Sequence, residues 1–249
     1  MEILRKGIKL LFEEGIDELF VQSYSHFVAP VLPNTQADYN EVQVLAAKLF
    51  DRHLPWRQKH NPHYESGIIE SLVQNAVPSD RVVIVGGGWG VTAVRSAKLV
   101  GPNGKVTVFE GSKSQVAKIK STIDLNDVTN GLEINHAVVG PNIRVYGHTG
   151  NADHVSPSEL PECDILELDC EGSELHILEN LEIRPRVIIA ESHGMYNSSA
   201  QNVVDKLESQ DYRVKSVSLA EKSNEDFCKE NDVKVVTGII DSRYSRHGA

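Results

Sequence analysis

Acidic side chains and one histidine follow two predicted strands at the points where those strands end. The strand 164–168 is followed by Asp169, Glu171 and Glu174, and the strand 187–190 by Glu191 and His193. Because the carboxyl ends of parallel strands border the ligand crevice of an open α/β sheet, we expect these side chains to converge near a cofactor. A histidine whose unperturbed pKa lies near neutrality suits proton transfer in such a place.

Each of these residues also has a purely structural interpretation. Glu171 or Glu174 would favour a helix N-terminus through the helix macrodipole, and His193 would be a hydrogen-bonded loop residue. Polar side chains at two adjacent strand ends favour a functional site instead. The candidate catalytic residues are therefore His193, Glu191, Glu171 and Asp169.

A glycine-rich loop, residues 86–90, joins the apolar strand 82–85 to a predicted helix that runs through Leu99. Glycines let the backbone turn tightly and approach a ligand, and a helix N-terminus presents N–H donors. An acid at the end of the next strand accepts hydrogen bonds from ribose hydroxyls in such sites, and Glu110 stands there. The expected cofactor-binding residues of this part are Gly86, Gly88, Gly90 and Glu110.

Two classes of cofactor use this layout. Residues 88–93 formally fit the dinucleotide pattern G-x-G-x-x-A, which would make the protein an NAD(P)-dependent oxidoreductase. Enzymes that use S-adenosylmethionine (SAM) have a related glycine loop and the same kind of acid. The loop does not choose between the two, but we find no Tyr-Lys type of catalytic pair after the later strands.

The elements that position these residues alternate between strand and helix, which predicts an α/β doubly wound, mostly parallel sheet of seven strands. We expect residues 132–139 to form one strand, with 143–146 as a short edge piece. The last two strands, 212–217 and 233–240, have no convincing helix between them and should form an antiparallel edge pair.

The N-terminal region reads differently. Residues 3–20 have the apolar spacing of an amphipathic helix, which could also serve as a dimer element, and a second helix is expected over 38–52. His53, His60 and His63 lie in proline-broken sequence that guarantees no metal geometry, so we assign no metal ligands. We divide the chain into an N-terminal helical extension, 1–62, and a catalytic domain, 63–249.

The composition bounds the function. The chain has 249 residues, with 25 basic and 35 acidic side chains and a net charge of −10. This acidic balance disfavours a nucleic-acid partner, so no such partner is expected. Three cysteines fit a reducing compartment, and neither a signal peptide nor a membrane span is apparent. We therefore expect a cytoplasmic protein, with a homodimer as a candidate assembly.

Residues 164–174 resemble the D-x-x-K-x-D-x-E-G-x-E segment of the FkbM family of SAM-dependent methyltransferases. Tyr64-Glu65 resembles the family's Y-E pair, 137–140 its A-V-G/S-D strand end, and 185–193 its R-P-x-x-x-x-x-E-x-H strand. The resemblance covers roughly residues 63–218. It implies a class I methyltransferase fold, SAM as methyl donor, and Ala137 and Asp169 among the cofactor-binding residues.

The resemblance also implies the reaction, which is methylation of a hydroxyl (or carboxyl) oxygen on a sugar, glycan or other small molecule. His193 is the first choice of base, with Glu191 and Glu171 as alternates. Whether a divalent cation binds at Asp169 and Glu191 is left open by the sequence. A non-catalytic SAM-fold binding protein is one alternative, and RNA methylation is disfavoured because an N-P-P-Y type of motif is missing.

Two positions depart from the family pattern. Ile84 stands where the family has an acid that helps to bind the methionine end of SAM, so another group, such as Asp169, must meet that ammonium. Glu167 stands where the family often has lysine. The first 62 residues lie outside the resemblance and receive no role from it.

Overall fold

The computed structural model describes residues 24–49, 51–53, 60–128, 131–141 and 149–240. The helix expected over 3–20 and the edge piece expected over 143–146 lie outside these residues. The chain divides into two compact units, Met1–Ala37 with Leu45–His60, and Asp38–Val44 with Asn61–Ala249. The larger unit holds every element of the central sheet.

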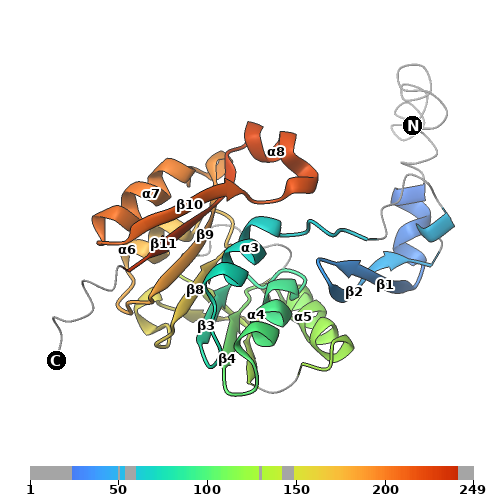
Figure 1. The fold of residues 1–249 in the computed structure, drawn as a ribbon. Helices are drawn as coiled ribbons and strands as arrows, with labels where there is room; N and C mark the ends of the chain where they lie inside the picture. The colour runs from blue at the N-terminus through green and yellow to red at the C-terminus, as the bar shows by residue number, and fades with distance from the viewer. Residues whose placement is uncertain (1–23, 50, 54–59, 129–130, 142–148, 241–249) are drawn as a thin grey trace. The chain divides into compact units, whose positions relative to one another are not determined.

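Seven strands form that sheet (Figure 1). Their spatial order is β10 (Arg213–Leu219), β11 (Val233–Ile239), β9 (Val187–His193), β8 (Ile165–Leu168), β3 (Arg81–Val85), β4 (Lys105–Phe109) and β5 (Leu132–Asn135). The five strands from β9 to β5 are parallel, whereas β11 is antiparallel to both β9 and β10. The predicted doubly wound sheet and its antiparallel edge pair are confirmed.

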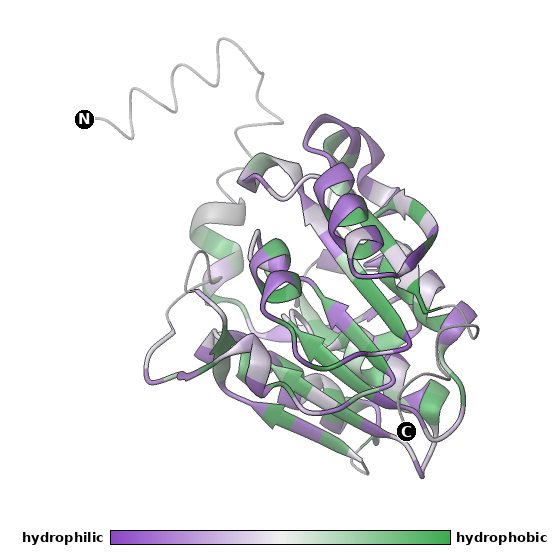
Figure 2. Cartoon of the chain, turned by 90° about the vertical axis from the view of Figure 1, so that its left-hand side faces the viewer, coloured by the Kyte–Doolittle hydropathy of each residue, from purple (hydrophilic) through white to green (hydrophobic). Residues whose placement is uncertain are grey.

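Helices cover the sheet. They are α3 (Ser66–Asn75), α4 (Val91–Val100), α5 (Lys113–Leu125), α6 (Glu174–Glu179), α7 (Ala200–Ser209) and the short α8 (Glu225–Glu230). Helix α4 packs between α3 and α5, and α6 packs on α7. The central strands β3, β8 and β9 are buried almost throughout and largely apolar, as the green strands of Figure 2 show, because both of their faces meet helices. One core, which includes Leu166, Ile188 and Leu207, fills the space under α6 and α7.

The register of the parallel strands brings the functional segments to one edge. Val85 of β3 is the partner of both Leu168 of β8 and Phe109 of β4. The next residues along the three strands, Gly86, Asp169 and Glu110, therefore leave the sheet side by side.

The helix expected over 38–52 is wrong. Residues in this region form a hairpin of β1 (Asn34–Tyr39) and β2 (Val42–Lys48). Asn40 and Glu41 both have positive φ, 49° and 65°, and a two-residue loop of this kind matches the twist of paired strands. Val42 and Val44 are buried while Gln43 between them is half-buried, so the period of two, not a helical period, places the side chains.

The strand expected over 132–139 is split. Residue His136 separates β5 from β6 (Ala137–Val139), and β6 pairs in parallel with β7 (Asp153–Val155) in a small second sheet. Short helical turns complete the described chain. They are η1 (Tyr24–Val28), η2 (Ala29–Val31), η3 (Asp51–His53), η4 (Pro157–Glu159), η5 (Gly194–Tyr196) and η6 (Lys222–Asn224). Among the described residues, no helix has the length and apolar character needed to cross a bilayer.

Candidate cofactor cleft and adjoining acidic pocket

A cleft of about 670 Å³, counted with its part open to solvent, lies at the carboxyl edge of the parallel strands. Six residues predicted from the sequence line it, namely Gly86, Gly88, Glu110, Ala137, Asp169 and Glu171. The prediction missed other lining residues, which include Gln115, Val138, Val139, Pro141 and Ser173. Most of these follow from the split strand and the first turn of α5, which no local motif marks.

The glycine loop is shaped by contacts that a side chain would prevent. Gly86 has φ +93°, and a Cβ added to it would lie 1.7 Å from the backbone carbonyl oxygen of Asp169. Gly88 has φ +48°, and its added Cβ would lie 3.3 Å from Oε1 of Glu65. Gly90, also predicted as cofactor-binding, is the residue before α4 and is not among the residues that line the cleft. A Cβ added to it would lie 3.0 Å from Cα of Ile119, so the glycine lets α4 pack closely on α5.

Glu110 is buried at the cleft wall, and both of its carboxylate oxygens accept backbone hydrogen bonds. Oε2 accepts from Gly87 N at 3.0 Å, and Oε1 accepts from Ser112 N at 2.7 Å. These bonds tie β4 to the glycine loop. Because a carboxylate oxygen can accept more than one hydrogen bond, Glu110 keeps capacity for a ligand's hydroxyl groups.

A second pocket, about 530 Å³ on the same measure, adjoins the cleft at Asp169, which lines both. Its wall carries four carboxylates, Glu65, Asp169, Glu191 and Glu221, together with apolar groups such as Phe227. Glu191, a predicted catalytic residue, therefore belongs to this pocket and not to the cleft.

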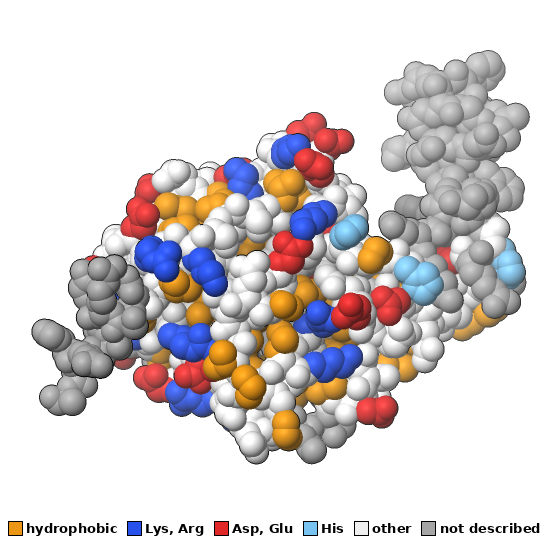
Figure 3. Space-filling model, viewed as in Figure 1, with side chains coloured by type: hydrophobic (Ala, Val, Ile, Leu, Met, Phe, Trp, Pro, Cys, Tyr) orange, Lys and Arg blue, Asp and Glu red, His pale blue; other side chains and the backbone are white. Residues whose placement is uncertain are grey.

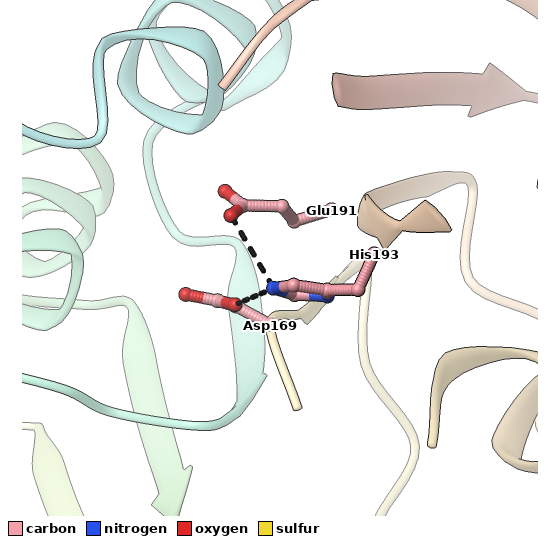
Figure 4. Close-up of side chains that lie close together, drawn as sticks. All are labelled: Asp169, Glu191 and His193. Atoms are coloured by element: carbon pink, nitrogen blue, oxygen red, sulfur yellow. Dashed lines mark ion pairs between the residues drawn. The ribbon is translucent and has the colours of Figure 1, made fainter. Parts of the chain in front are cut away.

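His193 is buried at the junction and contacts three carboxylates. Its Nδ1 lies 3.0 Å from Oε1 of Glu174, and its Nε2 lies 3.6 Å from Oδ1 of Asp169 and 3.6 Å from Oε1 of Glu191 (Figure 4). Oε1 of Glu174 also accepts hydrogen bonds from the backbone N–H groups of Cys170 and Gly172, each at 3.1 Å. The structure thus brings the predicted His193, Glu191 and Asp169 together.

The charges of this cluster shift its pKa values. Burial opposes the charged form of His193, but the hydrogen bond to Glu174 and the charge of Asp169 outweigh it and raise the pKa of His193 to about 9. Burial raises the pKa of Asp169 to about 6, against the lowering effect of His193. Burial, and then the charge of Asp169, raise the pKa of Glu191 well above its ordinary value. Burial alone would raise the pKa of Glu174, but the hydrogen bond with His193 outweighs burial, so the pKa of Glu174 is lowered.

Glu65 belongs to the Y-E pair noted in the sequence but was not predicted as a site residue; it lines the second pocket, and its Oε1 lies close to Gly88 of the cleft. Its Oε2 is buried and has no hydrogen-bond partner among the described residues. Burial, followed by the charges of Asp169 and Glu167, raises the pKa of Glu65 well above its ordinary value. Ile84 is fully buried in β3, so it presents no polar group to the cleft.

Within the described residues, one cluster of histidine, cysteine and carboxylate side chains is close enough to hold a metal ion. It consists of Asp169, Glu191 and His193, whose donor atoms all lie within 4.8 Å of one another. His53, His60 and His63 are not part of it.

No protein-family model matches the chain, and no curated protein matches it. Among solved structures, the chain matches the precorrin-6y C5,15-methyltransferase of Geobacter metallireducens at 13% identity and a TM-score of 0.51, over 72% of this chain and 88% of that one. The fold is that of the class I SAM-dependent methyltransferases. This confirms the predicted fold class.

Two fibrillarins also match. The one from Aeropyrum pernix, solved with natively bound S-adenosyl-L-methionine, has 10% identity and a TM-score of 0.45, over 70% of this chain and 76% of that one. The one from Methanococcus jannaschii, described as a pre-rRNA processing protein, has 11% identity and a TM-score of 0.49, over 72% and 76% of the two chains.

The expectation that the protein has no nucleic-acid partner is wrong, because the acidic net charge on which it rested does not exclude one. A ligand meets the local field, not the net charge of −10, and on the face drawn in Figure 3 lysine and arginine side chains lie among acidic ones. The charge of the whole chain is therefore no argument against such a partner.

Proposed function

We propose that the protein is a SAM-dependent methyltransferase that methylates a hydroxyl oxygen of a sugar or another small molecule. One observation carries this proposal. The cleft with the glycine loop and Glu110 meets, at Asp169, a second pocket that holds Glu191 and borders His193. A methyl donor and an acceptor need two adjoining sites of this kind.

The residues of the cleft fit SAM. Glu110 stands where ribose hydroxyls are bound in this fold, and Gly86 and Gly88 leave room for the close approach of a ligand to the backbone. Ala137 of β6 and Asp169 line the same cleft. When bound, SAM supplies a methyl group on a sulfonium sulfur that leaves as a neutral thioether.

Glu65 is our candidate for the ammonium of the methionine end. Ile84 removes the acid that related sequences place on β3. Glu65 instead brings a carboxyl group close to Gly88, with Oε1 nearest the glycine and Oε2 buried without a hydrogen-bond partner among the described residues. A buried carboxylate oxygen without a partner is costly, and a cationic group would relieve that cost. Asp169 and Glu65 would then face the positive end of the cofactor from two sides.

On the acceptor side, the chain's own residues orient the oxygen and receive its proton. Methyl transfer from a sulfonium depends chiefly on alignment, which two fixed pockets provide. Glu191 and His193 are the groups we propose to receive the hydroxyl proton, because both project toward the junction of cleft and pocket. Since the pKa of His193 is raised to about 9 and that of Glu191 is also raised, each would act in its deprotonated form, whose share grows as the pH rises. Glu171, which lines the cleft, is the alternate.

The finer assignments rest on sequence. The segment 164–174 supports membership of the FkbM family, with methyl transfer assigned to residues 63–249. The cysteines Cys163, Cys170 and Cys228 are free, which is consistent with a cytoplasmic protein.

The test has two stages. Calorimetry of the full chain with SAM, and separately with NAD(H), is expected to show binding of SAM alone; no binding at high micromolar SAM would overturn the proposal. Radiolabelled SAM is then incubated with pools of saccharides, hydroxylated and carboxylated small molecules, and RNA. Label in the saccharide or hydroxylated pool supports the acceptor class, whereas label in RNA would replace that class and leave methyl transfer standing.

A further inference from the structure

Three donor atoms converge at the junction of the two pockets. Glu191 and His193 are two residues apart on β9, so their side chains leave the same face of the strand, and Asp169 follows the neighbouring β8. Nε2 of His193 lies 3.6 Å from an oxygen of each carboxylate (Figure 4). The three side chains thus point at one small volume.

These contacts are too long for hydrogen bonds, which have donor–acceptor distances of about 2.7–3.2 Å. Nε2 of His193 makes no hydrogen bond within the described residues, although the side chain is only 7% exposed. Nε2 therefore stands between two carboxylate oxygens at ion-pair distance, and the donor atoms of all three side chains lie within 4.8 Å of one another, as they would around a shared cation.

The opposite side of the ring is firmly held. Nδ1 of His193 lies 3.0 Å from Oε1 of the fully buried Glu174, which is itself held by two backbone N–H groups. This bond fixes the plane of the imidazole and directs Nε2 at Asp169 and Glu191. A carboxylate on the far nitrogen is the usual support of a metal-ligating histidine.

We propose that Asp169, Glu191 and His193 bind a divalent metal ion. Ligand atoms about 2.1 Å from a four-coordinate ion lie roughly 3.4 Å apart. The two separations of 3.6 Å from His193 need only a slight contraction, and all three donor atoms already lie within 4.8 Å of one another. One imidazole and two carboxylates are a donor set for Mn²⁺, Fe²⁺ or Zn²⁺. In the described part of the chain, no lysine or arginine pairs with these carboxylates, so the ion would supply the balancing charge.

The role of the ion rests on the proposed function, although its binding does not. Asp169 and Glu191 line the second pocket, so open coordination positions of the ion face the space assigned to the acceptor. A hydroxyl oxygen coordinated there would lose its proton more readily, because the ion stabilises the oxyanion. With the ion bound, His193 and Glu191 would be ligands and not bases, the ion would displace the proton of His193, and the hydroxyl proton would pass to Glu171, the alternate base that lines the adjoining cleft.

The test is metal binding without SAM. The full chain is freed of metal with a chelator and titrated with Mn²⁺, and free Mn²⁺ is followed by electron paramagnetic resonance. We expect saturable binding of one Mn²⁺ per chain. Pulsed spectra of the bound ion should show coupling to one imidazole ¹⁴N, and this coupling should be absent in His193→Gln.

Variants locate the site. Asp169→Asn and Glu191→Gln should each weaken Mn²⁺ binding at least about tenfold, and Glu174→Gln by a similar factor through the histidine. Glu221→Gln, which changes another carboxylate of the same pocket, is the matched control and should bind as the parent does. Circular dichroism spectra and melting temperatures show which variants are folded. The ¹⁴N coupling is measured on the parent protein, so that part of the test stands even if a variant fails to fold.

Two results would overturn the proposal. The first is the absence of saturable binding at millimolar Mn²⁺, which would leave His193 as a protonated partner of the carboxylates. The second is saturable Mn²⁺ binding without the ¹⁴N coupling. SAM affinity measured in chelator is a separate readout, so loss of the metal site and loss of the methyltransferase proposal can be told apart.

Discussion

Oε1 of Glu174 accepts from two backbone N–H groups and lies 3.0 Å from Nδ1 of His193. A single oxygen on the first turn of α6 therefore joins the loop 170–172 to the last residue of β9. Sequence patterns suggested a helix N-terminal charge at this position, and the structure adds a tertiary partner nineteen residues away.

This arrangement predicts a large difference between two substitutions of Glu174. Glu174→Ala leaves two backbone donors and an imidazole nitrogen without their acceptor, so the free energy of unfolding should fall by about 3 kcal/mol. Glu174→Gln keeps an acceptor oxygen in place and should lose about 1 kcal/mol. Urea unfolding measures both. Glu179→Ala, an exposed change on the same helix, is the control and should stay within about 0.5 kcal/mol of the parent; equal losses for Ala and Gln at 174 would contradict the prediction.

Gly86 and Gly101 provide a matched pair for the glycine loop. Both have positive φ, +93° and +70°, but an added Cβ would lie 1.7 Å from a carbonyl oxygen at Gly86 and meets nothing within 4 Å at Gly101. Gly101→Ala should cost about 1 kcal/mol of stability, from backbone conformation alone. Gly86→Ala should cost several times more, or prevent folding, because β3 and β8 must separate. Thermal melting compares the two, and similar melting temperatures would show that the loop does not depend on this contact.

Glu65→Gln tests the proposed ammonium contact. Removing a charge-assisted bond should weaken SAM binding about tenfold or more. Methylthioadenosine has no amino acid end, so its affinity should be unchanged in the same variant. Calorimetry with both ligands gives the comparison, and Glu221→Gln serves as the control in the same pocket. An equal loss for the two ligands would mean that Glu65 shapes the cleft and does not meet the ammonium.

Glu167 should make stability depend on pH. Burial raises its pKa to about 8, whereas the bond with Thr92 acts downward, and in the unfolded chain the carboxyl titrates near 4.5. Between these values the folded chain holds a proton that the unfolded chain has lost, so this group's contribution to stability falls as the pH rises from 4.5 to 8. Glu167→Gln does not titrate and should therefore be more stable than the parent near pH 8, by a few kcal/mol, and little different near pH 4.5.

Urea midpoints of the parent and Glu167→Gln, measured near pH 5 and near pH 8, test this sign. Other buried carboxyls also titrate, but they are common to both proteins and cancel in the difference. A difference that stays constant with pH would mean that Glu167 is ionised in the folded chain at both values.

The sheet and its functional edge were predictable from sequence because their signals are local. Strand β3 is a continuous apolar run followed by glycines, and Asp169 and Glu110 stand directly after apolar strands. Once the strands are parallel and in register, these residues must emerge together, and the structure agrees.

The rest depends on contacts between distant segments. Gly90 belongs to a glycine pattern, yet only the packing of α4 on α5 shows that it faces Ile119. The turn at Asn40-Glu41 uses two residues in left-handed conformations without the glycine that usually marks such a turn. Glu65 enters the site because α3 begins beside Gly88, which neither segment shows alone.

Asp169 lines both the cleft and the acidic pocket, so its carboxylate is shared by two adjoining binding sites. Its field reaches whatever binds on either side, so a positive charge on one side changes the free energy of binding on the other. Such coupling is reciprocal, because each ligand must alter the other's affinity by the same factor. One carboxylate at a fixed position is thus enough to couple the affinities of the two sites, without any conformational change.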